Sequence, residues 1–253
     1  MARKLVGKSG VVVTSIYVNP TQFGPSEDFS KYPRDLKSDK KLCAQTGVDV
    51  LFLPDDKSMY PTDGSGLKYS VFVNEKELSQ GMEGASRPGH FEGVTTVVTK
   101  LFLLTQPHFA VFGAKDFQQA RVIQKMTTDL NFPVQIQLAP TAREPDGLAM
   151  SSRNKYLTPE QRLQASALWS AIQSATEILA AAKGKSVQAG TLREHMLKQI
   201  ESNSAFEVDY IEFFNPQNLQ PVTRVDFQCR VAIAARLGRV RLIDNASLAG
   251  SEI

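Results

Sequence analysis

Short runs of β-branched residues alternate with stretches of helical periodicity along the first half of the chain. Residues 11–18 and 48–53 are dense in Val, Ile and Leu and predict two buried strands, and residues 32–46 between them have helical character. After a Pro-, Gly- and Asp-rich loop at 54–66, a further strand is expected at 69–74. The order of these segments predicts a β-α-β unit.

A second set of elements follows in the same order. From Gly93 apolar residues recur at helical spacing until a proline stops them, which predicts a buried helix. Residues 108–112 are expected to form a short strand that meets Gly113 and leads into a helix over 114–130. Residues 133–138 predict another strand. Such alternation favours a doubly wound, mostly parallel α/β sheet with ligands at the carboxyl ends of its strands.

The pattern changes after Glu144. Thr158 offers an N-cap, followed by a first-turn proline and a capping-box glutamine, so a helix is predicted from there to Lys183. Further expected elements are a helix over 186–201 and strands over 208–214, 230–235 and 240–243, the last two joined by a hairpin at 237–239. We predict two domains, 1–143 and a smaller α+β domain at 144–253.

Composition narrows the range of partners. The 253 residues are 42% hydrophobic and 22% charged, as in a globular protein, and the net charge of +3 is too small to indicate a nucleic-acid surface. Cys43 and Cys229 lack metal-ligand spacing and favour a reduced, cytoplasmic setting. No apolar run approaches the roughly twenty residues that cross a bilayer, and residues 1–8 lack a signal-peptide cleavage site. Anionic small molecules remain possible partners, whereas nucleic acid and a membrane are not expected.

Two polar segments in the first half could contact a ligand. Residues 17–24 follow a predicted strand and hold Asn19 and Gln22, whose amides suit a hydroxy acid because they donate and accept without charge. They could equally be a turn and a solvated loop residue. The glycine-rich segment 81–94 places Arg87 and His90 at a helix start, where they could meet an anion. A lone histidine there is more often a structural hydrogen bonder.

Two later segments have phosphate-binding character. In residues 112–119, Gly113 allows close approach of the backbone, Lys115 supplies a point charge for phosphate and Asp116 can bind a ribose diol, while Gln119 lies one helical turn after Lys115. An ordinary exposed first turn explains the segment equally well. In the polar loop 143–154, two serines beside an arginine could clamp a polyphosphate, although a surface linker uses similar residues.

Together these segments resemble the pantothenate synthetase family, in the family's order and over nearly the whole chain. The resemblance is carried by Val-Asn-Pro-Thr-Gln-Phe-Gly at 18–24, Arg-Pro-Gly-His-Phe-Glu-Gly-Val at 87–94, Phe-Gly-Ala-Lys-Asp-Phe-Gln-Gln at 112–119, Met-Ser-Ser-Arg-Asn at 150–154 and Arg-Leu-Ile-Asp-Asn at 241–245. The first four of these segments are matches in register, which together are highly specific, and the segment 241–245 is similar to the family's closing strand. The resemblance implies a Rossmann-like fold of the nucleotidyltransferase superfamily.

The resemblance also implies a reaction and a set of residue roles. Pantoate would attack the α-phosphate of Mg-ATP to give pantoyl adenylate and pyrophosphate, and β-alanine would then displace AMP to form pantothenate. Pantoate would be held by Asn19, Gln22 and Gln119, with Phe23 against its gem-dimethyl group and His90 lining the pocket. The nucleotide would contact Gly113, Lys115, Asp116, Met150, Ser151, Ser152 and Arg153, of which Lys115 and the Ser-Ser-Arg group would serve catalysis. A homodimer is expected, whereas no metal ligands can be assigned.

One family feature does not occur in the sequence. Members begin with a strand and a His-x-Gly-His turn that contacts the ATP phosphates, and this chain contains only His90, His108 and His195. The resemblance therefore predicts an N-terminally truncated chain with impaired adenylation. Two other functions stay open at this point: another nucleotidyltransferase of the superfamily, which would transfer a nucleotide without forming an amide, and an inactive pantoate- or nucleotide-binding remnant.

Overall fold

The computed structural model describes residues 1–25, 27–62, 68–202 and 205–250. The chain divides into two compact units, which are described separately. Unit 1 consists of residues 1–112 and 122–137, and unit 2 consists of residues 113–121 and 138–253. The helix that begins after Gly113 therefore contributes its first turns to unit 2 and the rest to unit 1.

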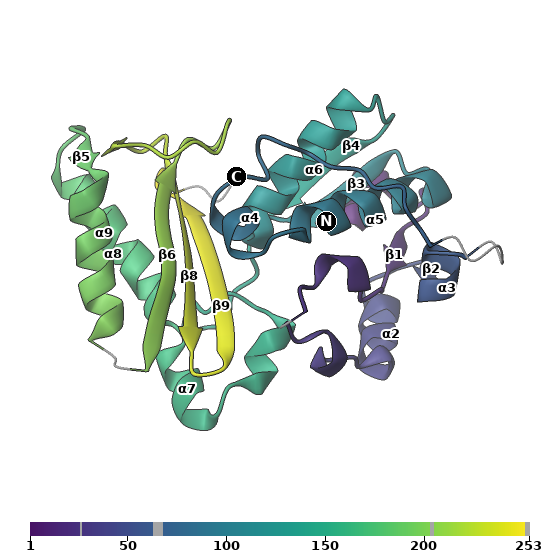
Figure 1. Ribbon diagram of the computed structural model, residues 1–253, viewed down its shortest axis with the longest axis horizontal. Helices are drawn as coiled ribbons and strands as arrows, with labels where there is room; N and C mark the ends of the chain where they lie inside the picture. Colours follow the sequence, from purple (N-terminus) through teal and green to yellow (C-terminus); the bar gives the residue numbers. More distant parts are fainter. Residues whose placement is uncertain (26, 63–67, 203–204, 251–253) are drawn as a thin grey trace. The chain divides into compact units, whose positions relative to one another are not determined.

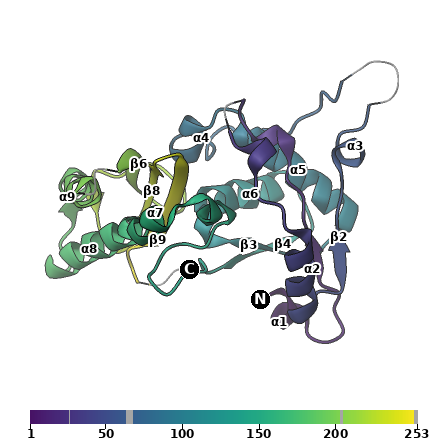
Figure 2. The same cartoon turned by 90° about the horizontal axis from the view of Figure 1, so that it is seen from below.

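Unit 1 is built from short strands and the helices around them. Its elements are α1 (Ala2–Val6), β1 (Val13–Ser15), η1 (Pro20–Gln22), η2 (Phe29–Lys31), α2 (Leu36–Gln45), β2 (Val50–Phe52), α3 (Asp56–Met59), α4 (Met82–Ser86), α5 (His90–Thr105), most of β3 (Phe109–Gly113) and β4 (Gln135–Ala139), and the later turns of α6 (Phe117–Asp129). β1 pairs in parallel with β2, and Figure 2 shows β2 beside α2. The predicted β-α-β unit is confirmed, with shorter strands than expected.

The core of unit 1 lies between α5 and α6. Val94, Val97, Val98 and Phe102 recur at the spacing of one helical face and pack against Ile123 and Met126 of α6 and against Met59. The buried helix that we predicted after Gly93 is therefore confirmed. It begins at His90, and it ends at Gln106, whose backbone is left-handed.

The strand predicted at 69–74 is wrong. Its apolar and aromatic residues suggested a β-strand, but the segment is irregular. Two threonines of α5 take the place of a neighbouring strand: Thr96 Oγ1 accepts from the Val73 amide at 2.9 Å, and Thr95 Oγ1 donates to the Val73 carbonyl at 2.5 Å. These hydroxyls satisfy both backbone groups of Val73, so this residue needs no sheet partner.

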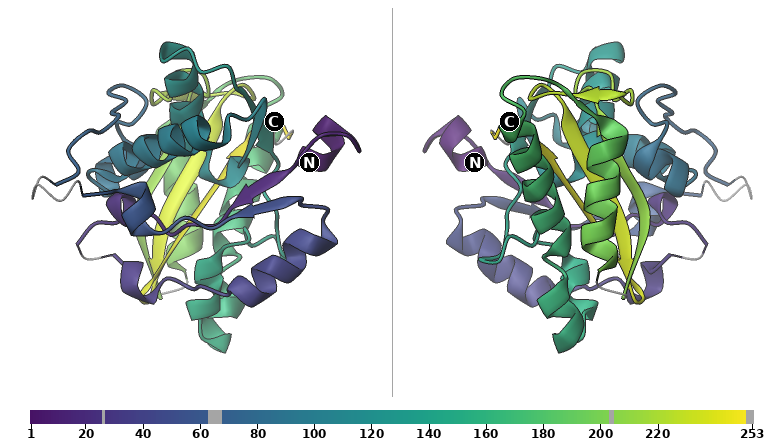
Figure 3. Two further views of the ribbon diagram at one scale, coloured as in Figure 1. Left: turned by 90° about the vertical axis from the view of Figure 1, so that its right-hand side faces the viewer. Right: turned by 90° about the vertical axis from the view of Figure 1, so that its left-hand side faces the viewer.

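Unit 2 is an antiparallel sheet with two helices on one face, which confirms the α+β expectation. The strands are β6 (Phe206–Phe214), β8 (Arg230–Leu237) and β9 (Val240–Ser247), in the order β6-β8-β9. Figures 1 and 3 show α8 (Ala167–Ala181) and α9 (Ala189–Glu201) side by side on this sheet. Leu237 pairs with Val240 around Gly238, which has a positive φ of 60°, so the predicted hairpin is confirmed.

The opposite face of this sheet is also covered within unit 2. The turn η3 (Ala114–Asp116) contacts β9, as does η4 (Ser152–Tyr156), and the Phe117 ring packs against Phe214 at 6.1 Å between centroids. All but one residue of β8 are buried as a result. A sheet covered on both faces gives η3 and η4 a rigid support.

The expectation of one continuous helix from Thr158 to Lys183 is wrong. The capping box at Thr158 forms as predicted, but the helix ends after six residues as α7 (Pro159–Gln164) and restarts as α8. Leu163 of α7 faces solvent, whereas Leu168 and Ile172 of α8 are buried. The next helix also starts later than expected, because Val187–Gln188 forms the short strand β5, paired with β7 (Arg224–Val225), which we did not predict.

Cys43 and Cys229 are free thiols. In the part of the chain that the structure describes, no helix combines the length and apolar character required to span a bilayer.

The packing of α9 leads to a stability prediction. Leu192 is fully buried against the sheet, with 0% of its side chain exposed, whereas Leu163 of α7 is 83% exposed. Leu192→Ala should lower the free energy of unfolding by about 2–5 kcal/mol, because it removes apolar contacts and leaves a cavity. Leu163→Ala, the matched control, should change it by less than about 0.5 kcal/mol. Urea denaturation monitored by circular dichroism measures both, and equal effects would contradict the placement of α9.

Candidate active site

In unit 1 the predicted amide turn is held by a buried asparagine. Asn19, which is 2% exposed, immediately precedes η1. Its Nδ2 donates to the Gly93 carbonyl at 3.1 Å and approaches Gln22 Oε1 at 3.4 Å. Its Oδ1 accepts from the Thr21 hydroxyl at 3.1 Å and from the Tyr60 hydroxyl at 2.6 Å. The Asn19 carboxamide is thus satisfied inside the protein, and binding a ligand through it would require one of these bonds to be exchanged.

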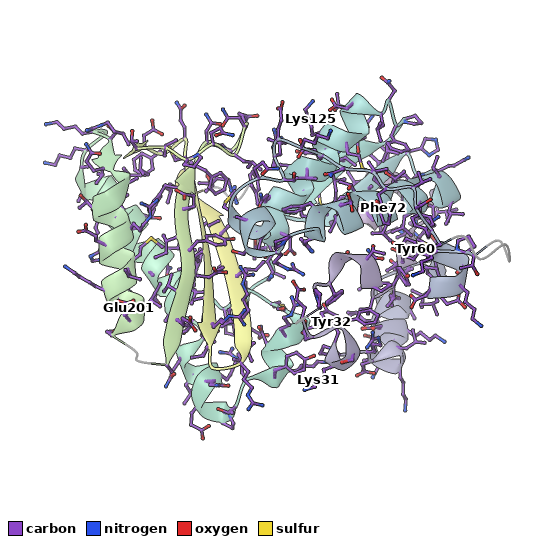
Figure 4. The ribbon with its side chains drawn as sticks, viewed as in Figure 1. Lys31, Tyr32, Tyr60, Phe72, Lys125 and Glu201 are labelled. Carbon is purple, nitrogen blue, oxygen red and sulfur yellow. The ribbon has the colours of Figure 1, made fainter. Side chains whose placement is uncertain are left out.

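Tyr60 is a site residue that the sequence did not reveal. It sits in an ordinary Met-Tyr-Pro sequence, yet its hydroxyl fixes the Asn19 oxygen, and its ring stacks edge-on with Tyr69 at 4.9 Å between centroids. Tyr60 also lines a pocket of about 600 Å³. Its lining is mostly aromatic and proline, from Pro20, Thr21, Asp56, Lys57, Tyr60, Pro61, Thr62, Tyr69 and Phe72. Figure 4 shows Tyr60 and Phe72 at the same end of unit 1.

A glycine allows the turn to approach α5. A Cβ added to Gly93 would lie 2.5 Å from the Thr21 carbonyl oxygen and 2.6 Å from the Gln22 amide nitrogen. Any side chain at this position would therefore push η1 away from the helix. Asn19 and Gly93 together set the position of Gln22.

His90 occupies the first position of α5 and is bonded at both ring nitrogens. Nδ1 lies 2.9 Å from the Gln22 carbonyl oxygen, and Nε2 lies 3.1 Å from Arg87 Nη1. Since a carbonyl only accepts and a guanidinium only donates, the proton must be on Nδ1 and the ring must be neutral. Burial lowers the pKa of His90 below its ordinary value, and the positive charge of Arg87 lowers it further, against smaller opposing effects of the Gln22 carbonyl, Glu83 and Glu27. His90 therefore orients Gln22 and is not poised as an acid.

Arg87 is fixed in turn by a carboxylate. Its guanidinium forms two bonds to Glu27, at 2.9 and 2.7 Å, and lies 3.7 Å from Glu83. Arg87 is thus paired inside the protein, which makes it a support for His90 and Gln22. The sequence singled out Arg87 for an anion but gave no signal for Glu27.

Phe23 belongs to an aromatic cluster. Its ring contacts Phe29 at 5.3 Å and Tyr32 at 5.7 Å between centroids, both edge-on. Figure 4 labels Tyr32 beside the adjoining Lys31. This geometry holds Phe23 rigidly and suits an apolar contact with a ligand.

In unit 2 the predicted phosphate turn is η3. Gly113 precedes it with an extended backbone, and no heavy atom lies within 4 Å of the position that a Cβ would take, so a ligand could approach here closely. The side chain of Lys115 is 18% exposed, and its Nζ lies 3.8 Å from an oxygen of Asp116. Gln119 follows in α6 and is partly buried.

The loop after Arg143 is more ordered than a polar linker. Arg143 and Ala149 form an antiparallel bridge, and Arg143 makes two bonds to the buried Asp244, at 2.7 and 3.0 Å. Its guanidinium also lies 3.6 Å from the ring centroid of Trp169. Gly147 has a φ of 89°, and a Cβ there would collide with the same indole. These contacts fix the start of the predicted clamp.

The Met-Ser-Ser-Arg segment continues from this loop into η4. Met150 is exposed, and Ser151 caps the turn by accepting from the Arg153 amide at 3.3 Å. Asn154 donates to the Ala149 carbonyl at 3.1 Å. Because η3 and η4 both contact β9, Lys115 and the Ser-Ser-Arg group belong to one supported part of unit 2.

Comparison with known proteins identifies the family to which the chain belongs. The profile of the family described as Pantoate-beta-alanine ligase matches residues 1–247. The chain belongs to this family. Pantothenate synthetase from Thermotoga neapolitana is 46% identical over 98% of this chain and 86% of its own length, and that from Moorella thermoacetica is 46% identical over 98% and 85%.

Solved structures of pantoate-β-alanine ligases share the fold. The crystal structure of pantothenate synthetase from Thermus thermophilus matches with a TM-score of 0.86 and 44% identity, over 94% of this chain and 83% of that one. The ligase from Francisella tularensis, crystallised with β-γ ATP and β-alanine, matches with a TM-score of 0.76 and 31% identity, over 100% and 85%. The α/β expectation is therefore confirmed at the level of the family.

The approach of η1 to α5 can be tested at Gly93. Gly93→Ala should lower the free energy of unfolding by about 1–3 kcal/mol, because the new methyl group overlaps the backbone of Thr21 and Gln22. The matched control is Gly190→Ala in α9, where nothing lies within 4 Å of the added Cβ. That variant should be neutral or stabilised by up to about 1 kcal/mol, since alanine favours a helix. Urea denaturation that ranks the two variants in the opposite order would contradict the close approach.

The neutral state of His90 predicts a pH effect on stability. Its pKa is lowered on folding, so the unfolded chain binds more protons at this residue below the ordinary histidine value of about 6.5. The free energy of unfolding should fall as pH drops from 7.5 to 5.5, by up to about 1.4 kcal/mol per pH unit from this group. His90→Asn should show a shallower decline in chemical denaturation at each pH. A slope identical to that of the wild type would rule out the buried neutral ring.

Proposed function

We propose that the chain joins pantoate to β-alanine in two steps at the expense of ATP. The carboxylate oxygen of pantoate attacks the α-phosphorus of ATP, and the bond to the bridging oxygen breaks to release pyrophosphate. The β-alanine amine then attacks the acyl carbon, loses a proton and displaces AMP. The first step is needed because a carboxylate is a poor electrophile and AMP is a good leaving group.

The observation that carries the nucleotide half of this proposal is the shared support of η3 and η4 on β9. It holds in one unit a lysine, two serine hydroxyls and a guanidinium, which suit a polyphosphate. We assign Lys115, Ser151, Ser152 and Arg153 to the phosphates. The open space beside Gly113 and the exposed carboxylate of Asp116 suit the ribose, and the exposed Met150 suits the adenosine. These groups would stabilise charge as pyrophosphate departs.

For pantoate we propose Asn19, Gln22 and, from family resemblance, Gln119. Gln22 is the principal contact, because its backbone is held by His90 and by the turn that Asn19 and Gly93 position. Asn19 would contribute by exchanging one of its internal hydrogen bonds. Phe23, fixed in its aromatic cluster, would contact the gem-dimethyl group. Such positioning, without a protein nucleophile, is sufficient for a reaction between two bound substrates.

We propose that Mg²⁺ takes part as Mg-ATP. The described residues include no group of three or more His, Cys, Asp or Glu side chains that could hold a metal ion, so phosphate oxygens and water would supply most of the ligands of Mg²⁺. The ion would neutralise charge on the phosphates, while Lys115 and Arg153 orient them. We also propose a homodimer, from family resemblance, which light scattering coupled to size-exclusion chromatography would test.

The role of Lys115 can be tested in the first step alone. Pantoate-dependent exchange of labelled pyrophosphate into ATP measures adenylation without β-alanine. Lys115→Ala should reduce kcat/KM for ATP on the order of 100-fold, because it removes a charged contact that strengthens as pyrophosphate leaves. The control is Lys125→Ala, which removes an exposed lysine of α6 that is labelled in Figure 4. Lys125 pairs with Asp129 at 2.7 Å.

Lys125→Ala should stay within about twofold of the wild type, since exposed ion pairs contribute little. Exchange by Lys115→Ala at the wild-type rate would refute the assignment of Lys115. Pantoyl adenylate that accumulates with no pantothenate formed when β-alanine is added would refute the second step.

A further inference from the structure

A second buried asparagine lies against the phosphate turn. Asn245 belongs to β9 and is 5% exposed. Its Nδ2 donates to the carbonyl oxygens of Ala114 at 3.0 Å and Lys115 at 2.6 Å. One side chain of the C-terminal sheet therefore holds two consecutive peptide groups of η3, including that of the lysine itself.

The other end of the Asn245 carboxamide is equally fixed. Its Oδ1 accepts from Nη2 of Arg230, on the neighbouring strand β8, at 2.8 Å. Since Arg230 can only donate and the two carbonyls can only accept, the orientation of the amide is determined. The Arg230 guanidinium also lies 4.0 Å from the ring centroid of Phe117, the first residue of α6. The turn is thus bonded at Ala114 and Lys115 and packed at Phe117.

We infer that Asn245 is a positioning residue for ATP, which acts through Lys115 and does not touch the substrate. This inference rests on the proposed role of Lys115. A long lysine side chain loses conformational freedom when it binds a phosphate. If the Cα position of the lysine is already fixed, fewer conformations have to be lost on binding. Two hydrogen bonds to the backbone at and before Lys115 provide that fixed origin.

A role limited to general stability would look different. Arg241, on the same strand, forms an ion pair with Asp209 of β6 at 2.7 Å, and this pair joins two strands of the sheet to each other. Removing the side chain of Arg241 or of Asn245 weakens the sheet. The bonds of Asn245 additionally connect the sheet to η3. Arg241→Ala is therefore the matched control for the structural cost of a change in β9.

A double-mutant cycle tests the inference on the whole chain. Isothermal titration calorimetry would measure the Kd for Mg-ATP of the wild type, Asn245→Ala, Lys115→Ala and the double variant, with thermal unfolding of each. Lys115→Ala should raise the Kd by about 10- to 100-fold, the range expected for a hydrogen bond to a charged group. Asn245→Ala should raise it about tenfold when Lys115 is present, and by less than about twofold when it is absent, because coupled residues do not add.

Asn245→Asp tests the acceptor end and the donor end of the amide separately. It can still accept from Arg230 but cannot donate to the carbonyls of Ala114 and Lys115, so it should weaken ATP binding as much as Asn245→Ala. If it binds ATP like the wild type, the bonds to the turn are unimportant and the inference fails. Should Asn245→Ala not fold, Asn245→Ser takes its place in the cycle.

The remaining outcomes are also decisive. Additive effects of Asn245→Ala and Lys115→Ala would overturn the inference, because Asn245 would then act independently of the lysine. So would an equal loss of affinity in Arg241→Ala. Wild-type affinity in Lys115→Ala would refute the proposed function instead, whereas wild-type affinity in Asn245→Ala beside a weakened Lys115→Ala would refute this inference alone.

Discussion

A buried carboxamide must find partners for both of its ends, and this constraint determines how each unit holds its candidate ligand turn. Burying an amide without hydrogen bonds costs several kcal/mol, so such a side chain is tolerated only where its surroundings are fixed. Asn19 ties η1 to α5 and to Tyr60, and Asn245 ties η3 to β9 and to Arg230. Each turn takes its geometry from the scaffold element to which the asparagine connects it.

The need of buried polar groups for hydrogen-bond partners also explains which polar residues are paired inside the protein and which are exposed. Glu27, Arg87 and His90 form a chain of hydrogen bonds that ends on the Gln22 carbonyl, and Asp244 and Arg143 form a second one that ends at the loop before Met150. Few of these groups remain available for a ligand. The side chains of these two hydrogen-bond networks therefore serve as supports, whereas the exposed Asp116 and Met150 are candidates for contact with a ligand.

Much of the fold could be predicted from local signals. The capping box at Thr158, the helical stripe of α5 and the hairpin at Gly238 each depend on neighbours in sequence, and each was confirmed. The failures involve distant partners. In the segment 69–74, the backbone of Val73 is bonded to threonine hydroxyls of α5 that lie 22 and 23 residues later in the chain. Motifs predicted Gln22 and Lys115 as candidates, but Tyr60 and Asn245, which hold the two turns, lie far away in sequence and have no motif of their own.

The stacking of Arg143 on Trp169 has an experimental consequence. Trp169 is the sole tryptophan among the 253 residues, and its indole lies against both Arg143 and Gly147 at the start of the Ser-Ser-Arg segment. Indole emission is sensitive to a nearby cation and to the polarity of its surroundings. Light emitted by this chain under tryptophan-selective excitation consequently comes from one residue of α8 that packs against this loop, which gives the protein an intrinsic optical reporter of the loop without any label.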